Sequence, residues 1–175
     1  MPSPLYHFSE DPGIEVFKPR LMPRRPEIAD PLVWAVDDEY AFSYLFPRDC
    51  PRILLWPLPG TTAEDRERWF SRSDAHALAH VEYAWFDRLR TACLYRYTLP
   101  VDLFEPLGPD SGPGNYVSRS AVVPTAMVAV PDLIEALRIA RVELRVLDRL
   151  TPLRGLWETT TLHWSGYRLG FAQDW

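Results

Sequence analysis

Short apolar runs, separated by turn-forming residues, make up most of the hydrophobic pattern of this chain. Runs of about four to eight apolar or alternating residues between such residues predict strands. The clearest lie at residues 32–36, 53–56 and 94–99. Further strands are predicted at residues 5–8, 76–83, 116–118, 125–130 and 143–147. In the run at 76–83 the alternation predicts a single apolar face.

Other segments have the spacing of short amphipathic helices. They lie at residues 61–70, 84–92 and 133–139. The first begins with Thr61 and Glu64 at the spacing of a capping box, in which each side chain bonds the backbone N–H of the other. Asp132 is placed to cap the third. A shorter helix is predicted just after the strand at 32–36, and it must stop at Pro47 because the residue before a proline disfavours helical geometry.

The high proline content supports the prediction of short elements. The 175 residues include 18 prolines, roughly twice the usual share of about 5%, together with seven tryptophans. This composition favours short strands bounded by rigid turns over a helical bundle. Because strands and helices do not alternate strictly, we expect an α+β fold. We expect one domain over residues 1–175, with a bent or split mixed β-sheet and short helices.

Charge and cysteine content narrow the classes of function. The net charge of −5 and the isoelectric point near 5.4 argue against a broad nucleic-acid-binding surface, which requires a basic domain. No run of about 18 apolar residues is present, so no transmembrane helix is expected. Glu10, Asp11 and Glu15 come too early for a secretory signal. We therefore expect a cytoplasmic protein in which Cys50 and Cys93 are free thiols.

The first predicted strand carries the first candidate site residues. His7 and Ser9 are two positions apart, so a strand places the imidazole and the hydroxyl on one face. Such a pair suits a ribose or a phosphate. The alternative is a histidine that bonds a neighbouring backbone carbonyl. Tyr44 is a candidate to stack on a nucleotide base, and packing in the core is its alternative role.

Arginines in proline-rich segments are candidates to complete an anion pocket, because guanidinium groups match the geometry of phosphate. Arg20 lies in a cluster with Arg24 and Arg25, and Arg119 follows the strand at 116–118. Arg48 and Arg52 flank Cys50 in the sequence LFPRDCPRILLW. The alternative is a set of internal salt bridges with carboxylates such as Asp49.

Motifs of the common enzyme classes are missing from the sequence. It contains no GxGxxG, P-loop, GxSxG or CxxC. His76 and His80 share a face on a strand or a helix, but no third ligand is spaced beside them, so no metal site is predicted. Cys50 lies between two arginines, which would lower its pKa if the thiol were exposed, and a thiol enzyme is therefore a further hypothesis.

Long passages resemble a family of small bacterial proteins known only as a domain of unknown function. They include LYHFSEDPGIEVFKPR, PLVWAVDDEYAFSYLFPRDCPRILLW, AHVEYAWFDRLRTACLYRYTLP and the tail LTPLRGLWETTTLHWSGYRLGFAQDW. This resemblance covers nearly the whole chain and implies no activity.

A second resemblance concerns the first 45 or so residues. LYHFS, followed by FKPR and then by an apolar strand and a short helix, is similar to the opening of the ADP-ribosyltransferase fold. In that group, which includes the diphtheria-toxin type enzymes and the tRNA 2′-phosphotransferases, a first-strand histidine contacts the ribose of NAD. The resemblance assigns this catalytic role to His7 and an aromatic position to Tyr40 or Tyr44. The glutamate of the group falls on Glu143 or Glu158, neither in a recognisable motif.

The sequence thus predicts a cytoplasmic protein that binds NAD or another nucleotide, of ADP-ribosyltransferase-like fold and with transferase activity as a further expectation. His7, Ser9 and Tyr44 would contact the nucleoside, and Arg20, Arg48 and Arg52 would hold the phosphates. The alternative is an interaction or structural protein without a small-molecule site.

Overall fold

The computed structural model describes residues 3–22, 28–108 and 113–175. The fold is α+β, as predicted. The described residues form ten strands in two sheets, together with three α-helices and several short 3₁₀ helices. The predicted split of the sheet is therefore confirmed, with one sheet antiparallel and the other mixed. The chain divides into two compact units, Met1–Tyr44 with Cys93–Val130 and Leu45–Ala92 with Pro131–Trp175.

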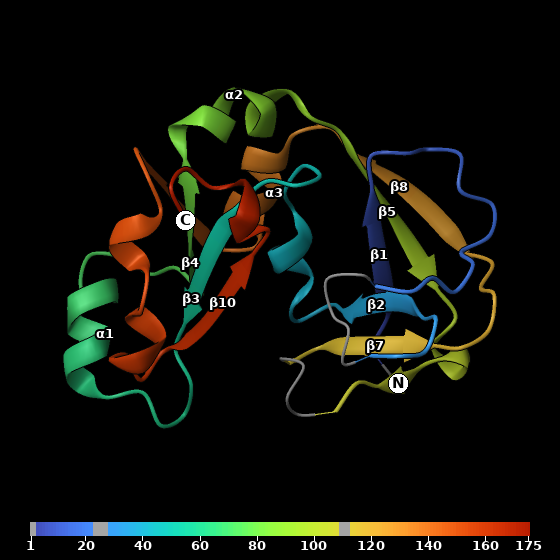
Figure 1. Cartoon of the computed structure of the whole chain (residues 1–175), viewed down its shortest axis with the longest axis horizontal. Coiled ribbons are helices and arrows are strands. Elements are labelled where there is room, and N and C mark those ends of the chain that lie inside the picture. The colour runs from blue at the N-terminus through green and yellow to red at the C-terminus, as the bar shows by residue number, and fades with distance from the viewer. Residues whose placement is uncertain (1–2, 23–27, 109–112) are drawn as a thin grey trace. The chain divides into compact units, whose positions relative to one another are not determined.

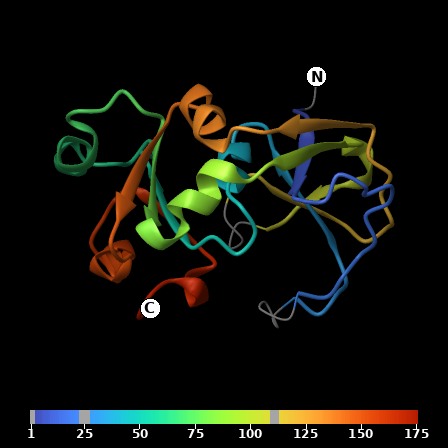
Figure 2. The same cartoon turned by 90° about the horizontal axis from the view of Figure 1, so that it is seen from above.

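The first unit contains the antiparallel sheet, in the order β6-β7-β2-β1-β5-β8 (Figures 1 and 2). Its strands are β1 (Leu5–Ser9), β2 (Val33–Asp37), β5 (Leu94–Leu99), β6 (Glu105–Pro106), β7 (Asn115–Ser118) and β8 (Ala126–Val130). Two 3₁₀ helices, η1 (Ala41–Tyr44) and η2 (Val101–Leu103), belong to the same unit. One face of the sheet carries a buried apolar cluster formed by Leu5, Phe17, Val33, Ala35, Tyr97, Leu99 and Val122.

The second unit contains the mixed sheet, in the order β10-β3-β4-β9 (Figure 1). Its strands are β3 (Arg52–Trp56), β4 (Ala77–Glu82), β9 (Val142–Leu147) and β10 (His163–Tyr167). Its helices are α1 (Ala63–Phe70), α2 (Tyr83–Thr91), α3 (Leu133–Ile139) and the 3₁₀ helices η4 (Thr151–Leu153), η5 (Leu156–Glu158) and η6 (Leu169–Phe171). The core cluster of this unit includes Ile53, Leu55, Leu78, Leu150, Leu153 and Leu162.

Strand β4 differs from its predicted pattern. The alternation predicts one apolar face, but every residue from Ala77 to Glu82 is buried. The face that the alternation predicts to be exposed is covered by packing: Leu78 belongs to the core cluster, and Trp69 packs against His80. Even Glu82 is fully buried, where its carboxylate accepts hydrogen bonds from the backbone N–H groups of Leu150 and Gln173 and so fixes the C-terminal segment.

The start of α1 also corrects the sequence prediction. The N-cap is Thr62, whose hydroxyl accepts the N–H of Asp65, and not Thr61. The Thr61 hydroxyl instead accepts the N–H of Leu58 and donates to the carbonyl of Thr161. A partner 100 residues away therefore shifts the cap by one position. The predicted Asp132 cap of α3 is confirmed, since its carboxylate accepts the N–H of Glu135.

No helix in the described parts of the chain is long and apolar enough to cross a bilayer.

Candidate functional site

His7 lies where the first two strands of the antiparallel sheet separate. β1 and β2 pair through their backbones at Leu5 and Tyr6, and the next residue, His7, contacts β2 through its side chain. Its Nδ1 lies 2.9 Å from the carbonyl oxygen of Trp34, and this is the bond to a neighbouring carbonyl that was the alternative role of His7. A carbonyl only accepts hydrogen bonds, so Nδ1 carries a hydrogen, and Nε2 is an acceptor when the ring is neutral. The half-buried ring packs against Phe17, with 4.7 Å between the ring centroids.

The hydroxyl of Ser9 belongs to the turn that follows β1. Its buried Oγ accepts the N–H of Asp11, and the Asp11 carboxylate in turn accepts the N–H of Gly13. Tyr97 fixes the same turn, because its hydroxyl donates to the Asp11 carbonyl and accepts the N–H of Ile14. Ser9 therefore shapes the loop beside His7.

Tyr44 ends the 3₁₀ helix that follows β2. Its hydroxyl donates to Oδ1 of Asn115 at 3.1 Å, and its side chain is half-buried. The carboxylate of Asp37 accepts the N–H of Tyr40 and so starts the turn that leads into this helix. The short helix predicted before Pro47 is thus present, in 3₁₀ form.

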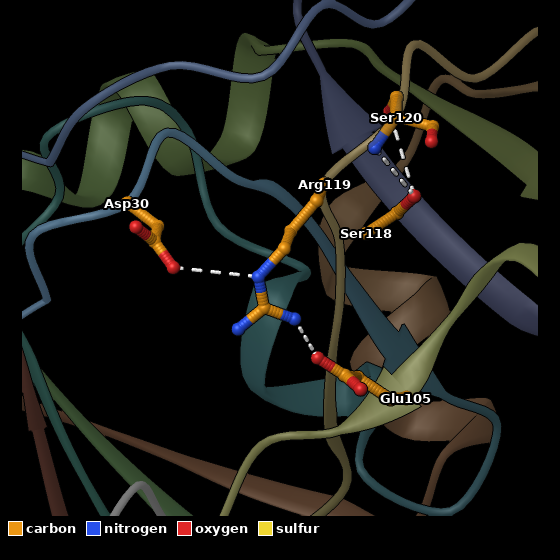
Figure 3. A network of polar contacts seen from close by, with 5 residues as sticks. All are labelled: Asp30, Glu105, Ser118, Arg119 and Ser120. Atoms are coloured by element: carbon orange, nitrogen blue, oxygen red, sulfur yellow. Dashed lines mark hydrogen bonds and ion pairs between the residues drawn. The ribbon is translucent and has the colours of Figure 1, made fainter.

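A cleft of about 510 Å³ lies in the first unit, at the far end of β2 from Asp37. Leu32 and Val117 contribute apolar wall, and Arg119, Asp30 and Glu105 contribute charge. Figure 3 shows that the Arg119 guanidinium donates to both carboxylates, through Nε to Asp30 at 3.3 Å and through Nη1 to Glu105. These groups are exposed, so water screens the ion pairs and they contribute little stability.

Arg20 approaches the same cleft through its backbone. Its N–H and carbonyl pair with those of Leu32, both at 3.0 Å, while its side chain is exposed. The structure therefore places Arg20 beside the cleft that Arg119 lines, but His7 and Ser9 are not among the lining residues. Arg24 and Arg25, predicted to share a cluster with Arg20, lie outside the described residues.

Arg48 and Arg52 belong to the second unit, in different surroundings. Arg48 is exposed, whereas only 5% of Arg52 is accessible. The Arg52 guanidinium lies between the rings of Phe46 and Tyr167, at 4.8 and 4.4 Å from their centroids, and Nη1 donates to the Cys50 carbonyl. Two cation–π contacts and a buried hydrogen bond give this arginine a structural role.

The acidic neighbour of these arginines pairs elsewhere. Asp49 contacts Nε of Arg168 at 3.8 Å. Asp49 also has a positive φ of 66°, a conformation that aspartate tolerates better than most residues.

Both cysteines are free thiols, as predicted. Cys50 is fully buried, and burial raises the pKa of its thiol to about 11 against the opposing effect of Arg52 and Arg88. A thiol with that pKa is almost entirely protonated at neutral pH, which removes the chemical basis of the thiol-enzyme hypothesis.

The two glutamates that the fold resemblance indicates lie in the second unit. Glu143 on β9 accepts a hydrogen bond from Nε of Arg145 at 2.7 Å. Burial would raise its pKa, but hydrogen bonds from Ser73 and Arg145 outweigh that effect and hold the pKa below its usual value. Glu158 is exposed in η5.

The two histidines considered as metal ligands differ in their exposure to solvent. His76 is exposed just before β4, and His80 is buried within it. Among the described residues, no cluster of three or more His, Cys, Asp or Glu is arranged to hold a metal ion.

Sequence reasoning missed the pairing of Arg119 with Asp30 and Glu105. These carboxylates are 89 and 14 residues away along the chain, so no local spacing indicates them. The register of β2 with β7 creates the contact, because it brings Val33 opposite Ser118 and hence Arg119 next to the segment that enters β2.

Comparison with known proteins places the chain in a family. The model of a family of unknown function, DUF6886, matches residues 6–172. The chain belongs to this family. The match includes His7 and every other candidate residue discussed above. Neither the curated proteins nor the solved structures contain a significant match to the chain.

Proposed function

We propose that this protein binds NAD or a related nucleotide in the cytoplasm, and that His7 contacts a ribose hydroxyl. The observation that carries the proposal is the hydrogen bond from Nδ1 of His7 to the Trp34 carbonyl. With Nδ1 as the donor, a neutral imidazole has Nε2 as an acceptor, and a ribose hydroxyl is a matching donor. The Phe17 ring holds the imidazole in place, so little side-chain entropy is lost on binding.

The similarity of the first strand to the ADP-ribosyltransferase fold supports the same ligand, since a histidine at this position contacts the ribose of NAD in that group. An ADP-ribosyltransferase-like fold and a transferase reaction are the finer part of the proposal. Arg20 and Arg119 are the candidates for phosphate binding in the first unit, because Arg119 lines its cleft and the backbone of Arg20 pairs with Leu32, a residue of the cleft wall. A phosphate would compete with Asp30 and Glu105 for the Arg119 guanidinium.

Thermal denaturation with NAD, ADP-ribose and ATP tests the proposal. A ligand with a dissociation constant of about 1 mM, present at about 10 mM, stabilises the native state by about 1.4 kcal/mol. For a chain of this size the melting temperature then rises by roughly 3–6 °C. No shift with any of the three ligands would refute nucleotide binding.

The substitution His7→Asn sharpens the test. An asparagine amide takes the position of Nδ1, so it keeps the hydrogen bond to Trp34 and removes Nε2. We expect a folded variant whose melting temperature no longer responds to the ligand. His163→Asn is the matched control, because His163 is another half-buried histidine and has no role in the proposal. Release of nicotinamide from NAD, measured by chromatography, tests the transferase-type chemistry separately.

A second candidate function is an interaction or structural protein without a small-molecule site. It is favoured by His7, whose Nδ1 bonds the Trp34 carbonyl, and by Arg52, a predicted phosphate ligand whose guanidinium instead packs between two aromatic rings. Under this hypothesis the nucleotides leave the melting temperature unchanged, and His7→Asn has only its effect on stability.

A further inference from the structure

Strand β8 forms one end of the antiparallel sheet. It pairs with β5 along its whole length, from Thr98 opposite Ala126 to Leu94 opposite Val130. Within the described residues no strand pairs with its other edge. Figure 1 shows the strand beside β5, at the border of its sheet. Its outer backbone N–H and C=O groups are therefore available to a further strand.

The chemistry of this edge is unusual. Residues 120–131 contain no Asp, Glu, Lys or Arg. The side chains are apolar on both faces, and Met127 and Val128 are 43% and 50% exposed. Edge strands of monomeric proteins commonly carry charges, prolines or bulges that prevent pairing with other chains. Here the two prolines, Pro124 and Pro131, lie outside the strand and leave its five residues able to pair.

We infer that β8 is a homodimer interface, in which it pairs antiparallel with β8 of a second copy about a two-fold axis at Val128. This register places Val128 opposite its own counterpart, Met127 opposite Ala129 and Ala126 opposite Val130. Every cross-strand pair is then apolar, so the edge is complementary to itself. Such an isologous contact closes after two copies and does not propagate into a filament.

Charges on the next strand do not oppose this arrangement. Arg96 is opposite Val128 on β5, so three inter-strand spacings separate the two Arg96 residues of the dimer. That distance is about 14 Å, which exceeds the Debye length of about 8 Å at physiological ionic strength. The uncharged edge therefore brings together two copies with little repulsion, and a second copy is the occupant that its sequence favours.

The molar mass of the full chain in solution, measured by light scattering after size exclusion, tests the inference. We expect the wild type at twice the chain mass of 20.3 kDa. Val128→Lys places two like charges opposite each other on the axis and should give a monomer. Val128→Thr is the matched control, because threonine is β-branched and uncharged, and it should stay dimeric. Val128 is half exposed, so neither change buries a charge. The lysine lies opposite Arg96 on β5, which lowers stability modestly, so circular dichroism must verify that both variants are folded.

A cysteine cross-link tests the register. Directly opposed residues of antiparallel strands have Cα atoms about 4.5–5.5 Å apart, within the range of a disulfide. In a Cys93→Ser background, Val128→Cys should form a covalent dimer under mild oxidation, whereas Ile139→Cys, exposed on α3, should not. A monomeric wild type overturns the inference. The edge of β8 would then be a candidate binding site for a peptide of another protein. A dimer that survives Val128→Lys, or fails to cross-link through Val128→Cys, overturns it as well.

Discussion

Acidification should destabilise this protein through His80, a histidine buried in the middle of β4. Only 2% of His80 is accessible, Nδ1 lies 3.3 Å from the Ile53 carbonyl, and the ring edge packs against Trp69. Burial lowers its pKa from 6.5 to about 4. Between these two values the unfolded chain binds a proton that the folded chain does not. Stability is therefore complete above pH 6.5 and falls as the pH drops toward 4.

The size of the effect follows from the shift in pKa. About 2.5 pKa units correspond to roughly 3 kcal/mol, of which about 2 kcal/mol is lost by pH 5. That is a large part of the usual stability of about 5–15 kcal/mol. Urea denaturation at several pH values between 7.5 and 4.5 measures it directly.

A substitution separates His80 from other groups that titrate in this range. Burial also lowers the pKa of His163, so the wild-type curve contains both contributions. In His80→Asn the amide retains the donor to Ile53 but does not titrate, and we expect the curve to flatten by roughly 2 kcal/mol between pH 7 and 5. Only the slope of the free energy of unfolding against pH is compared, because the smaller side chain also lowers stability at every pH. An equal slope in wild type and variant would refute the assignment to His80.

Two further predictions concern polar and backbone constraints elsewhere. Asp65 accepts the N–H and the hydroxyl of Thr161, both at 2.6 Å, and these bonds lower its pKa. Asp65→Asn should lower the free energy of unfolding by roughly 1.5–3 kcal/mol, measured by urea denaturation at pH 7. The difference from wild type should narrow below about pH 4, as the wild-type carboxylate protonates. A difference that does not change with pH would contradict the assignment to the charged carboxylate. Gly114 has φ of +72°, and a Cβ there would lie 2.4 Å from a ring carbon of Tyr40, so Gly114→Ala should lose roughly 1–3 kcal/mol in the same assay. Gly60→Ala, which meets nothing within 4 Å, is its control and should be nearly neutral.

Local patterns predicted the elements of this fold well where the signal is complete within one segment. The strand at 94–99 and the Asp132 cap of α3 both depend on neighbouring residues, and both are found at the predicted positions. The predictions failed where a distant partner decides. Thr61 loses the capping role because its hydroxyl bonds Thr161, and β4 loses its exposed face because Leu150 and Gln173, distant along the chain, cover it.

The candidate arginines show the same limit for function. Arg52 and Arg119 have similar local contexts, each at one end of a short strand with a serine, cysteine or proline nearby. Their partners differ. Two aromatic rings bury the guanidinium of Arg52, whereas two exposed carboxylates pair with the guanidinium of Arg119 at a cleft. An anion must displace a buried ring from Arg52, which costs packing, but only a water-screened carboxylate from Arg119. Of the two, Arg119 is therefore the one able to exchange its present partners for a phosphate. An Arg119→Ala variant should weaken nucleotide binding and change the melting temperature of the ligand-free protein only slightly.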